Sequence, residues 1–383
     1  MDKVCIIGAG IIGMLTAKLL AEQGVEVHLI EQGYAGKESS WAGGGIISPL
    51  YPWRYDDSIS VLAQWGQAQY PQLLAQLNEK TGIDPEYQQS GLLYLSIEEE
   101  LSKAQAWMNE FSYSFEALYG EQLSKTEKEL NNQFQQGWLT KSIGQVRNPR
   151  LVKSMQKLML ISENIHLHEQ TRVTELIVEK QQVKGVKTES TNGQSQSFYA
   201  DRVIVAGGAW TAKLLDNYQS VPRIAPVKGQ MIVFKAPENL IQHIVLSKGR
   251  YLIPRKDGRI VLGSTLEFNQ FDKTIDDDTL EELRLEAIRI VPELANYEVE
   301  KQWAGLRPGS IDGIPYVGEH PELKHLYLNA GHFRNGIVIG YASCELLKNM
   351  LLEQECILDP RPYALTANRL LASSEEVKLE GAY

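Results

Sequence analysis

Residues 3–31 read KVCIIGAGIIGMLTAKLLAEQGVEVHLIE and decide how the chain is expected to fold. The apolar run 3–7 is typical of a buried strand, and GAGIIG at 8–13 follows it directly and fits the pattern GxGxxG. Apolar residues at helical spacing come next, and a second apolar run ends at Glu31. A strand, a glycine turn, a helix and a second strand closed by an acid predict a dinucleotide-binding unit.

Each residue type in this unit has a physical task. Gly8 allows the tight turn, Gly10 lets backbone N–H groups approach a pyrophosphate, and Gly13 lets the helix pack close to the strand. The start of the helix offers the positive end of its dipole to the phosphates. Glu31 lies eighteen residues after Gly13 and would accept hydrogen bonds from ribose hydroxyls. The alternative is a glycine-rich turn that only packs.

Size and charge limit the class of protein. The length of 383 residues allows a large core and predicts two domains. A hydrophobic content of 43% and a charged content of 22% are ordinary for a soluble globular protein. The formal net charge is −10 and the pI is about 5.4, and no basic stripe offsets this balance. Because nucleic acids are polyanions, we expect no nucleic-acid partner.

The sequence lacks the signals of membrane, secreted and metal-binding proteins. No apolar run reaches the roughly 20 residues that cross a bilayer, and the first strand starts at residue 3 without a secretory pattern. Cys5, Cys344 and Cys356 have no CxxC spacing and no clustered histidines, so we expect no metal site. Reduced thiols and a cytoplasmic location fit these features best.

Two further glycine clusters follow predicted strands. The run WAGGG at 41–45 comes soon after the second strand, where three successive glycines suggest backbone lying close against a ligand. A flexible hinge is the alternative reading of that run. Gly207 and Gly208 follow the short apolar strand 203–206, at the strand end where ligands dock on doubly wound sheets.

The order of these signals predicts an interleaved α/β fold. Nucleotide-type signals occur near both ends and in the middle of the chain, whereas the stretch after Pro226 is rich in predicted strands. We therefore expect a Rossmann-like cofactor domain interleaved with an α+β substrate domain that contains a large antiparallel sheet. The predicted boundaries are 1–48, 144–222 and 306–365 for the cofactor domain, 49–143 and 223–305 for the substrate-binding domain, and 366–383 for a polar tail.

Several local elements are also predicted. Apolar spacing indicates a helix over 59–77, which Pro71 should kink or split, and another helix over 98–119. A small meander is expected from three short strands, at 165–168, 172–178 and 184–188.

Taken together, these motifs resemble the D-amino acid oxidase family of FAD-dependent oxidoreductases. Within it the chain is most similar to the branch that oxidises glycine and is linked to thiamine synthesis, and the resemblance covers roughly residues 1–365. The most specific stretches are YLIPRKDGR at 251–259, WAGLRP at 303–308 and GHFRNGI at 331–337.

The resemblance implies an enzyme with non-covalent FAD. No cysteine lies between Cys5 and Cys344 that could attach a flavin near the pocket. The implied reaction passes a hydride from the α-carbon of glycine, sarcosine or a small D-amino acid to flavin N5. The products are the 2-oxo acid and ammonia, and O₂ is reduced to hydrogen peroxide. A homo-oligomer, a tetramer in this family, is implied as well.

The resemblance also assigns site residues. Arg307 would pair with the substrate carboxylate, Tyr251 would close the pocket, and Arg334 would reach the substrate from the flavin-binding segment. The implied cofactor-binding residues are Gly8, Gly10, Ile11, Ile12, Gly13, Glu31, Gln32, Ser39, Gly43, Gly44, Gly45, Val173, Gly207, His332, Phe333, Arg334, Asn335, Gly336, Ile337 and Val338.

Other readings stay open at this point. A D-amino acid dehydrogenase would pass the electrons to a quinone, and a tRNA-modifying protein can contain an oxidase-like domain. A non-catalytic FAD-binding protein is a further alternative. Without the resemblance, an arginine such as Arg307 is more often a surface or structural ion-pair residue.

Overall fold

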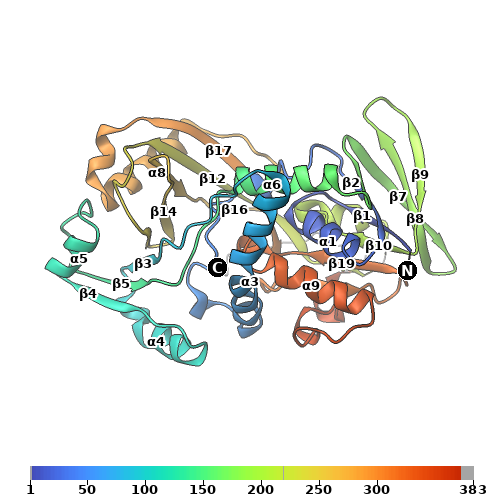
Figure 1. Cartoon of the computed structure of the whole chain (residues 1–383), viewed down its shortest axis with the longest axis horizontal. Helices are drawn as coiled ribbons and strands as arrows, with labels where there is room; N and C mark the ends of the chain where they lie inside the picture. Colours follow the sequence, from blue (N-terminus) through green and yellow to red (C-terminus); the bar gives the residue numbers. More distant parts are fainter. Residues whose placement is uncertain (1, 219, 372–383) are drawn as a thin grey trace.

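The computed structural model describes residues 2–218 and 220–371, and it contains two large sheets that lie side by side (Figure 1). The first has six strands in the order β18-β19-β10-β1-β2-β6, and all of its pairings are parallel except that of β18 with β19. Its strands are β1 (Lys3–Ile7), β2 (Glu26–Ile30), β6 (Ile165–His168), β10 (Arg202–Val205), β18 (Tyr316–Glu319) and β19 (Leu326–Ala330).

The side chains of β1 alternate between the two faces of this sheet, as the pleat of a strand requires. Val4 and Ile6 join a core formed with four helices, whereas Cys5 and Ile7 join a core on the opposite face. The helices are α1 (Ile11–Ala21), α3 (Asp57–Thr81), α6 (Asn148–Ile161) and α9 (Gly340–Leu351). The opposite face is covered by a meander of β7 (Thr171–Glu179), β8 (Gln182–Ser190) and β9 (Ser195–Tyr199).

Three local predictions need correction. Strand β6 is not part of the meander, because it pairs in parallel with β2 and extends the six-stranded sheet. Helix α3 is not split at Pro71, which lies on the exposed side while the buried side packs continuously against the core. The helix predicted over 98–119 ends early: α4 covers Leu101–Glu110, and β4 (Glu116–Tyr119) pairs with β5 (Gln136–Thr140).

The second sheet has nine strands in the order β16-β12-β15-β14-β13-β3-β5-β4, with β17 also paired to β12. All of its pairings are antiparallel except that of β13 with β3, so the predicted large antiparallel sheet is confirmed. Its remaining strands are β3 (Leu92–Leu95), β12 (Ile224–Lys235), β13 (Ile244–Ser247), β14 (Arg250–Pro254), β15 (Arg259–Gly263), β16 (Glu267–Phe268) and β17 (Val299–Ser310).

Short elements complete the described chain. Helix α8 (Asp277–Ile290) packs on the antiparallel sheet, and α2 (Ser39–Ala42) follows the second parallel strand. The others are α5 (Glu121–Thr126), α7 (Thr211–Leu215), β11 (Val221–Pro222) and β20 (Leu370–Leu371). Most of the predicted tail, from residue 372 on, lies outside the described residues.

The observed architecture confirms the predicted fold class, an α/β fold with a Rossmann-like sheet beside an α+β part. The domain boundaries remain a prediction, since α3 belongs to the stretch 49–143 and yet packs in the core of the parallel sheet. Within residues 2–218 and 220–371, no helix is long and apolar enough to cross a membrane. No three His, Cys, Asp or Glu side chains of the described chain are placed to hold a metal ion.

Candidate functional site

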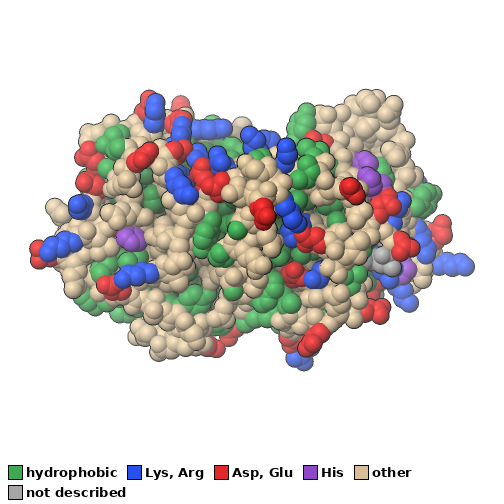
Figure 2. Space-filling model, viewed as in Figure 1, with side chains coloured by type: hydrophobic (Ala, Val, Ile, Leu, Met, Phe, Trp, Pro, Cys, Tyr) green, Lys and Arg blue, Asp and Glu red, His purple; other side chains and the backbone are tan. Residues whose placement is uncertain are grey.

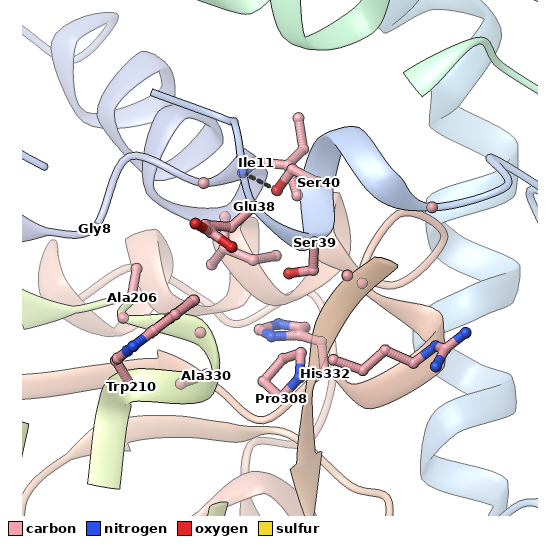
Figure 3. Close-up of a pocket in the computed structure, with 18 of the residues that line it drawn as sticks. Gly8, Ile11, Glu38, Ser39, Ser40, Ala206, Trp210, Pro308, Ala330 and His332 are labelled. Carbon is pink, nitrogen blue, oxygen red and sulfur yellow. Dashed lines mark hydrogen bonds between the residues drawn. The ribbon is translucent and has the colours of Figure 1, made fainter. Parts of the chain in front are cut away.

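A cavity of about 510 Å³ opens where the parallel sheet meets the antiparallel sheet (Figure 3). The residues after β1, β2 and β10 line it, and so do residues of β12, β14 and β17. The carboxyl ends of parallel strands are where nucleotides bind to doubly wound sheets. A volume of this size is typical of pockets for small molecules and cofactors.

The structure brings nearly all of the predicted site residues to this one cavity. Gly13, Asn335 and Val338 are the predicted residues that do not line it. Those that do are Gly8, Gly10, Ile11, Ile12, Glu31, Gln32, Ser39, Gly43, Gly44, Gly45, Val173, Gly207, Tyr251, Arg307, His332, Phe333, Arg334, Gly336 and Ile337.

The glycine turn after β1 is shaped by close contacts. Gly8 has a φ of +101°, and a Cβ there would lie 2.5 Å from the carbonyl oxygen of Ala206. A Cβ on Gly13 would overlap the carbonyl oxygen of Gly8, so α1 can pack this close to β1 only with glycine at that position. These two glycines therefore perform the turn and packing tasks that the motif predicts.

The start of α1 is open toward the cavity. Gly10 precedes the helix without a side chain to cap it, and the first turn contains no acidic residue. The N–H of Ile11 donates to Oγ of Ser40 at 2.9 Å, as Figure 3 shows. Because no side chain at the N-cap position covers the helix start, its first turn can face a phosphate, and Ser40 joins the predicted Ser39 on the facing wall. The paired serines at 39–40 were the only signal for Ser40.

Glu31 is held rigidly beside the glycine turn. Its Oε2 accepts from the N–H of Ala9 and its Oε1 accepts from the N–H of Gly33, each at 2.9 Å. Burial raises the pKa of Glu31, while these two N–H groups act in the opposite direction. Each carboxylate oxygen has a further lone pair, so the side chain fits the hydroxyls of a ribose.

The glycine run at 43–45 is fixed from behind by Arg255, a residue that the sequence did not single out. Its Nη2 donates to the carbonyl oxygen of Gly44 at 2.6 Å, and its Nη1 donates to Oε1 of Gln145 at 2.8 Å and to the carbonyl oxygen of Val146 at 3.1 Å. Burial lowers the pKa of Arg255 to about 10. The run is therefore a braced wall of the cavity and not a hinge.

His332 lines the cavity, and its side chain is neutral. Burial lowers its pKa to about 3. Ser343 Oγ donates its hydrogen to the carbonyl oxygen of Gly340 at 2.9 Å, so at 2.8 Å it must accept from Nε2–H of His332. Nδ1 of His332 then carries a lone pair. Figure 3 shows the ring on the cavity wall with Ser39 and Pro308.

Helix α3 supports the segment that contains His332. The hydroxyl of Tyr70, which is fully buried, donates to the carbonyl oxygen of Ile337. A Cβ on Gly66, one turn earlier, would overlap the carbonyl oxygen of Val338. Residues 331–338 are thus held against the helix core by backbone contacts that depend on these two α3 residues.

The side chain of Arg307, which belongs to β17, lines the other end of the cavity. Its Nη2 donates to Oγ of Ser264 at 2.6 Å, and its Nη1 donates to the carbonyl oxygen of Thr265 at 3.3 Å. Within residues 2–218 and 220–371 it forms no ion pair. Burial lowers the pKa of Arg307, and the nearby positive charge of Arg334 acts in the same direction.

Two glycines of the antiparallel sheet make room for the side chains at this end. A Cβ on Gly229 would overlap the guanidinium of Arg307, which lies flat on β12. A Cβ on Gly263 would come within 2.5 Å of the Tyr251 hydroxyl, so the ring lies across β15. Tyr251 is 6% exposed, and Arg334 is half-buried on the cavity wall.

Known proteins are similar to this chain over most of its length. The model of the family described as FAD dependent oxidoreductase (DAO) matches residues 3–350. The chain is 43% identical to a glycine oxidase of Pseudomonas aeruginosa over 95% of its own length and 98% of that protein. It is 28% identical to the bifunctional protein ThiO/ThiG of a Synechocystis species, covering 97% of this chain and 55% of that protein.

Solved structures show the same architecture. The crystal structure of glycine oxidase from Geobacillus kaustophilus matches with a TM-score of 0.88 at 28% identity, covering 96% of this chain and 99% of the other. A glycine oxidase structure from Bacillus cereus matches with a TM-score of 0.85 at 30% identity, covering 97% and 99%.

Proposed function

This chain belongs to the DAO family of FAD dependent oxidoreductases, and we propose that it oxidises glycine and other small amines such as sarcosine and small D-amino acids. The products are the 2-oxo acid, ammonia and hydrogen peroxide, and the reaction serves thiamine biosynthesis. FAD is the cofactor, and the braced glycine turn, the open start of α1 and the fixed Glu31 fit its diphosphate and ribose.

One observation carries the proposal: Arg307 is a positive charge at the inner end of the cavity without a carboxylate partner in the described chain. Arg307 is half-buried, and a ligand that fills the cavity would withdraw its charge from water, which is costly unless a counter-charge pairs with it. A guanidinium binds a carboxylate through two parallel hydrogen bonds, which fixes direction as well as energy. The α-carboxylate of an amino acid is the counter-charge that fits.

FAD, when bound, supplies the acceptor for the hydride that leaves the α-carbon of the amine. The protein's part is to hold the substrate. Arg307 anchors the carboxylate, Tyr251 excludes water from the inner end, and Arg334 lies on the wall that carries His332. Positioning of this kind accounts for a large share of a barrier when the reacting atoms are correctly aligned.

No side-chain base is placed at the substrate end. Among the described residues that line the cavity, the acids are Glu31 and Glu38, beside the cofactor turn and the α1 start, and the one histidine is His332. The pKa of His332 is about 3, and its Nε2–H is committed to Ser343. The substrate amine must therefore arrive neutral, so that its own lone pair assists departure of the hydride.

A substrate panel tests the proposal. Purified protein with FAD should release hydrogen peroxide with glycine and with sarcosine, in proportion to the oxygen consumed. The opposite result would be no peroxide with either amine alongside fast reduction of a quinone-like dye by bulky D-amino acids. That pattern would favour the D-amino acid dehydrogenase reading.

The cellular setting is also proposed. We expect a cytoplasmic homo-tetramer that does not bind nucleic acid. Figure 2 shows basic and acidic side chains interspersed on the face in view, which is consistent with the net charge of −10 and unlike a nucleic-acid surface. Sedimentation of the holoenzyme, and its failure to retain tRNA at physiological salt, are the measurements that check these expectations.

A further inference from the structure

A short segment from the antiparallel sheet reaches across to the cofactor end of the cavity. This segment, residues 269–275 and here called the strap, joins β16 to α8. Its first half is anchored by Lys228, a lysine 4% exposed, whose Nζ lies 3.1 Å from Glu267 and 3.7 Å from Asp272. Its far end is fixed by Asp276, which caps α8 by accepting from the N–H of Thr279 at 2.7 Å.

The middle of the strap contacts both walls of the cavity. Lys273 Nζ lies 2.9 Å from each carboxylate oxygen of Glu38. The ring of Phe271 lies 5.9 Å from that of Trp210 and 5.9 Å from Nζ of Lys213. Glu38, Trp210 and Lys213 all line the cavity. Figure 3 shows Glu38 and Trp210 on different sides of it, so the strap connects two walls of the cavity.

We propose that the strap completes the FAD site: Phe271 and Lys273 close the mouth of the cofactor channel and slow the release of FAD. This inference rests on FAD binding alone and not on the identity of the amine. The cofactor domain supplies the floor of the channel, and the substrate-binding part supplies the closing piece.

Charge gives Lys273 a second task. The diphosphate of FAD is negative, and Glu38 lies on the wall next to Ser39 and Ser40 at the start of α1. Without Lys273, the Glu38 carboxylate would face the diphosphate with no positive partner. The pair therefore holds the strap closed and removes a repulsion that would weaken FAD binding.

The same contacts contribute little to the stability of the fold. Lys273 and Glu38 are 43% and 40% exposed, and ion pairs on a protein surface have small effects on unfolding. Phe271 is 45% exposed, so its ring is not part of a closed core. Loss of these side chains should therefore speed the release of FAD and lower the stability of the FAD-saturated enzyme by no more than the weaker FAD binding accounts for.

The test is the rate at which diluted holoenzyme releases FAD, followed by the increase in flavin fluorescence. Phe271→Ala and Lys273→Ala should each speed release about threefold, and the double variant about tenfold. Lys187→Ala is the matched control, because Lys187 forms an exposed ion pair of similar length with Glu175, at 2.8 Å on the meander. It should release FAD at the wild-type rate. The exchange Glu38→Lys with Lys273→Glu should return release close to that rate.

Three results would overturn the proposal. The first is a wild-type release rate in the Phe271→Ala, Lys273→Ala double variant. The second is equal acceleration in the Lys187→Ala control. The third is a fall in the unfolding free energy of the FAD-saturated double variant well beyond the about 1.4 kcal/mol that tenfold weaker FAD binding accounts for, because the strap would then support the fold and not the cofactor.

Discussion

The two ends of the cavity are built in opposite ways. At the proposed cofactor end the protein offers mostly main chain, from the start of α1, the run 43–45 and the segment 331–337. At the proposed substrate end it offers the side chains of Arg307 and Tyr251, which belong to β17 and β14 of the antiparallel sheet. In the proposed site, the cofactor end would bind through backbone N–H groups, whereas the substrate end would bind through a fixed charge.

Glycine has a different task at each end. At the cofactor end, the lack of a side chain at Gly8 permits a tight turn, and its lack at Gly10 leaves space for a ligand. At the substrate end, Gly229 and Gly263 make room for functional side chains of the protein itself. A glycine in a motif and an isolated glycine in a strand can therefore be equally important to function.

The largest expected effect comes from removing the fixed charge. Arg307→Met should remove about 3 kcal/mol of transition-state stabilisation for glycine, because the substrate carboxylate would lose its partner. The value of kcat/KM should then fall roughly two-hundredfold. FAD affinity should stay at the wild-type value, since Arg307 belongs to the other end. Steady-state peroxide release and FAD titration measure the two quantities.

Arg255→Met is the matched control for that prediction. Arg255 is buried, whereas Arg307 is half-buried, and neither has a carboxylate partner among the described residues; Arg255 donates to Gly44, Gln145 and Val146 and does not line the cavity. Its loss should weaken FAD binding through the run 43–45. Equal losses of kcat/KM at saturating FAD in both variants would mean that neither arginine binds the substrate.

The second effect tests the cofactor end. Gly10 has a φ of −70°, and a Cβ there would meet only Ser40 Oγ, at 3.3 Å. Gly10→Val should therefore fold and yet fill the space in front of the α1 start. The loss of charge-assisted hydrogen bonds should weaken the free energy of FAD binding by about 2 kcal/mol, so the dissociation constant should rise roughly thirtyfold. Gly10→Ala should show a smaller rise, and identical affinities in both variants would contradict this role.

This contrast explains how much could be predicted from the sequence. The cofactor end was predictable because its pattern is local: GAGIIG between two apolar runs already requires a strand, a turn and a helix. The parallel sheet, the large antiparallel sheet and the role of Gly13 in packing follow from that pattern and from the order of the segments. Pro71 misled because tertiary packing kept α3 continuous despite it.

The substrate end could not be predicted from local pattern. Arg255 and Arg307 both follow apolar strand residues, and the family resemblance alone distinguished them; the structure separates them by what their guanidinium groups contact. Gly229 has no motif, because its role depends on its place beside Arg307 across paired strands. The strap escaped notice because Lys273 and Phe271 act on residues more than fifty positions away.

A smaller effect is expected where glycine makes room for a side chain. Gly229→Ala should push the guanidinium of Arg307 off β12 and raise the KM for glycine about tenfold, with FAD affinity unchanged. Gly305→Ala is the comparison on the facing residue of β17, where a Cβ would meet Ala42 at 2.5 Å and not Arg307. If Gly229→Ala also raised the KM tenfold in an Arg307→Met background, its effect would not act through Arg307.

The last expected effect concerns the pH dependence of stability and tests whether the cofactor end carries a charge that titrates. The pKa of His332 is about 3, below the value near 6.5 of an unfolded chain, so the unfolded state binds one more proton between these values. Stability should fall as pH falls from about 6.5 toward 3, and His332 should contribute up to about 1.4 kcal/mol per pH unit. The lowered pKa values of His28, His168 and His325 act in the same direction.

Urea unfolding at saturating FAD, at pH 7 and at pH 5, measures this effect. The loss of unfolding free energy between the two pH values should be smaller for His332→Gln than for the wild type. An equally steep loss would mean that His332 takes up a proton in the folded enzyme. The cofactor end would then carry a charge that depends on pH, whereas the charge of Arg307 at the substrate end does not.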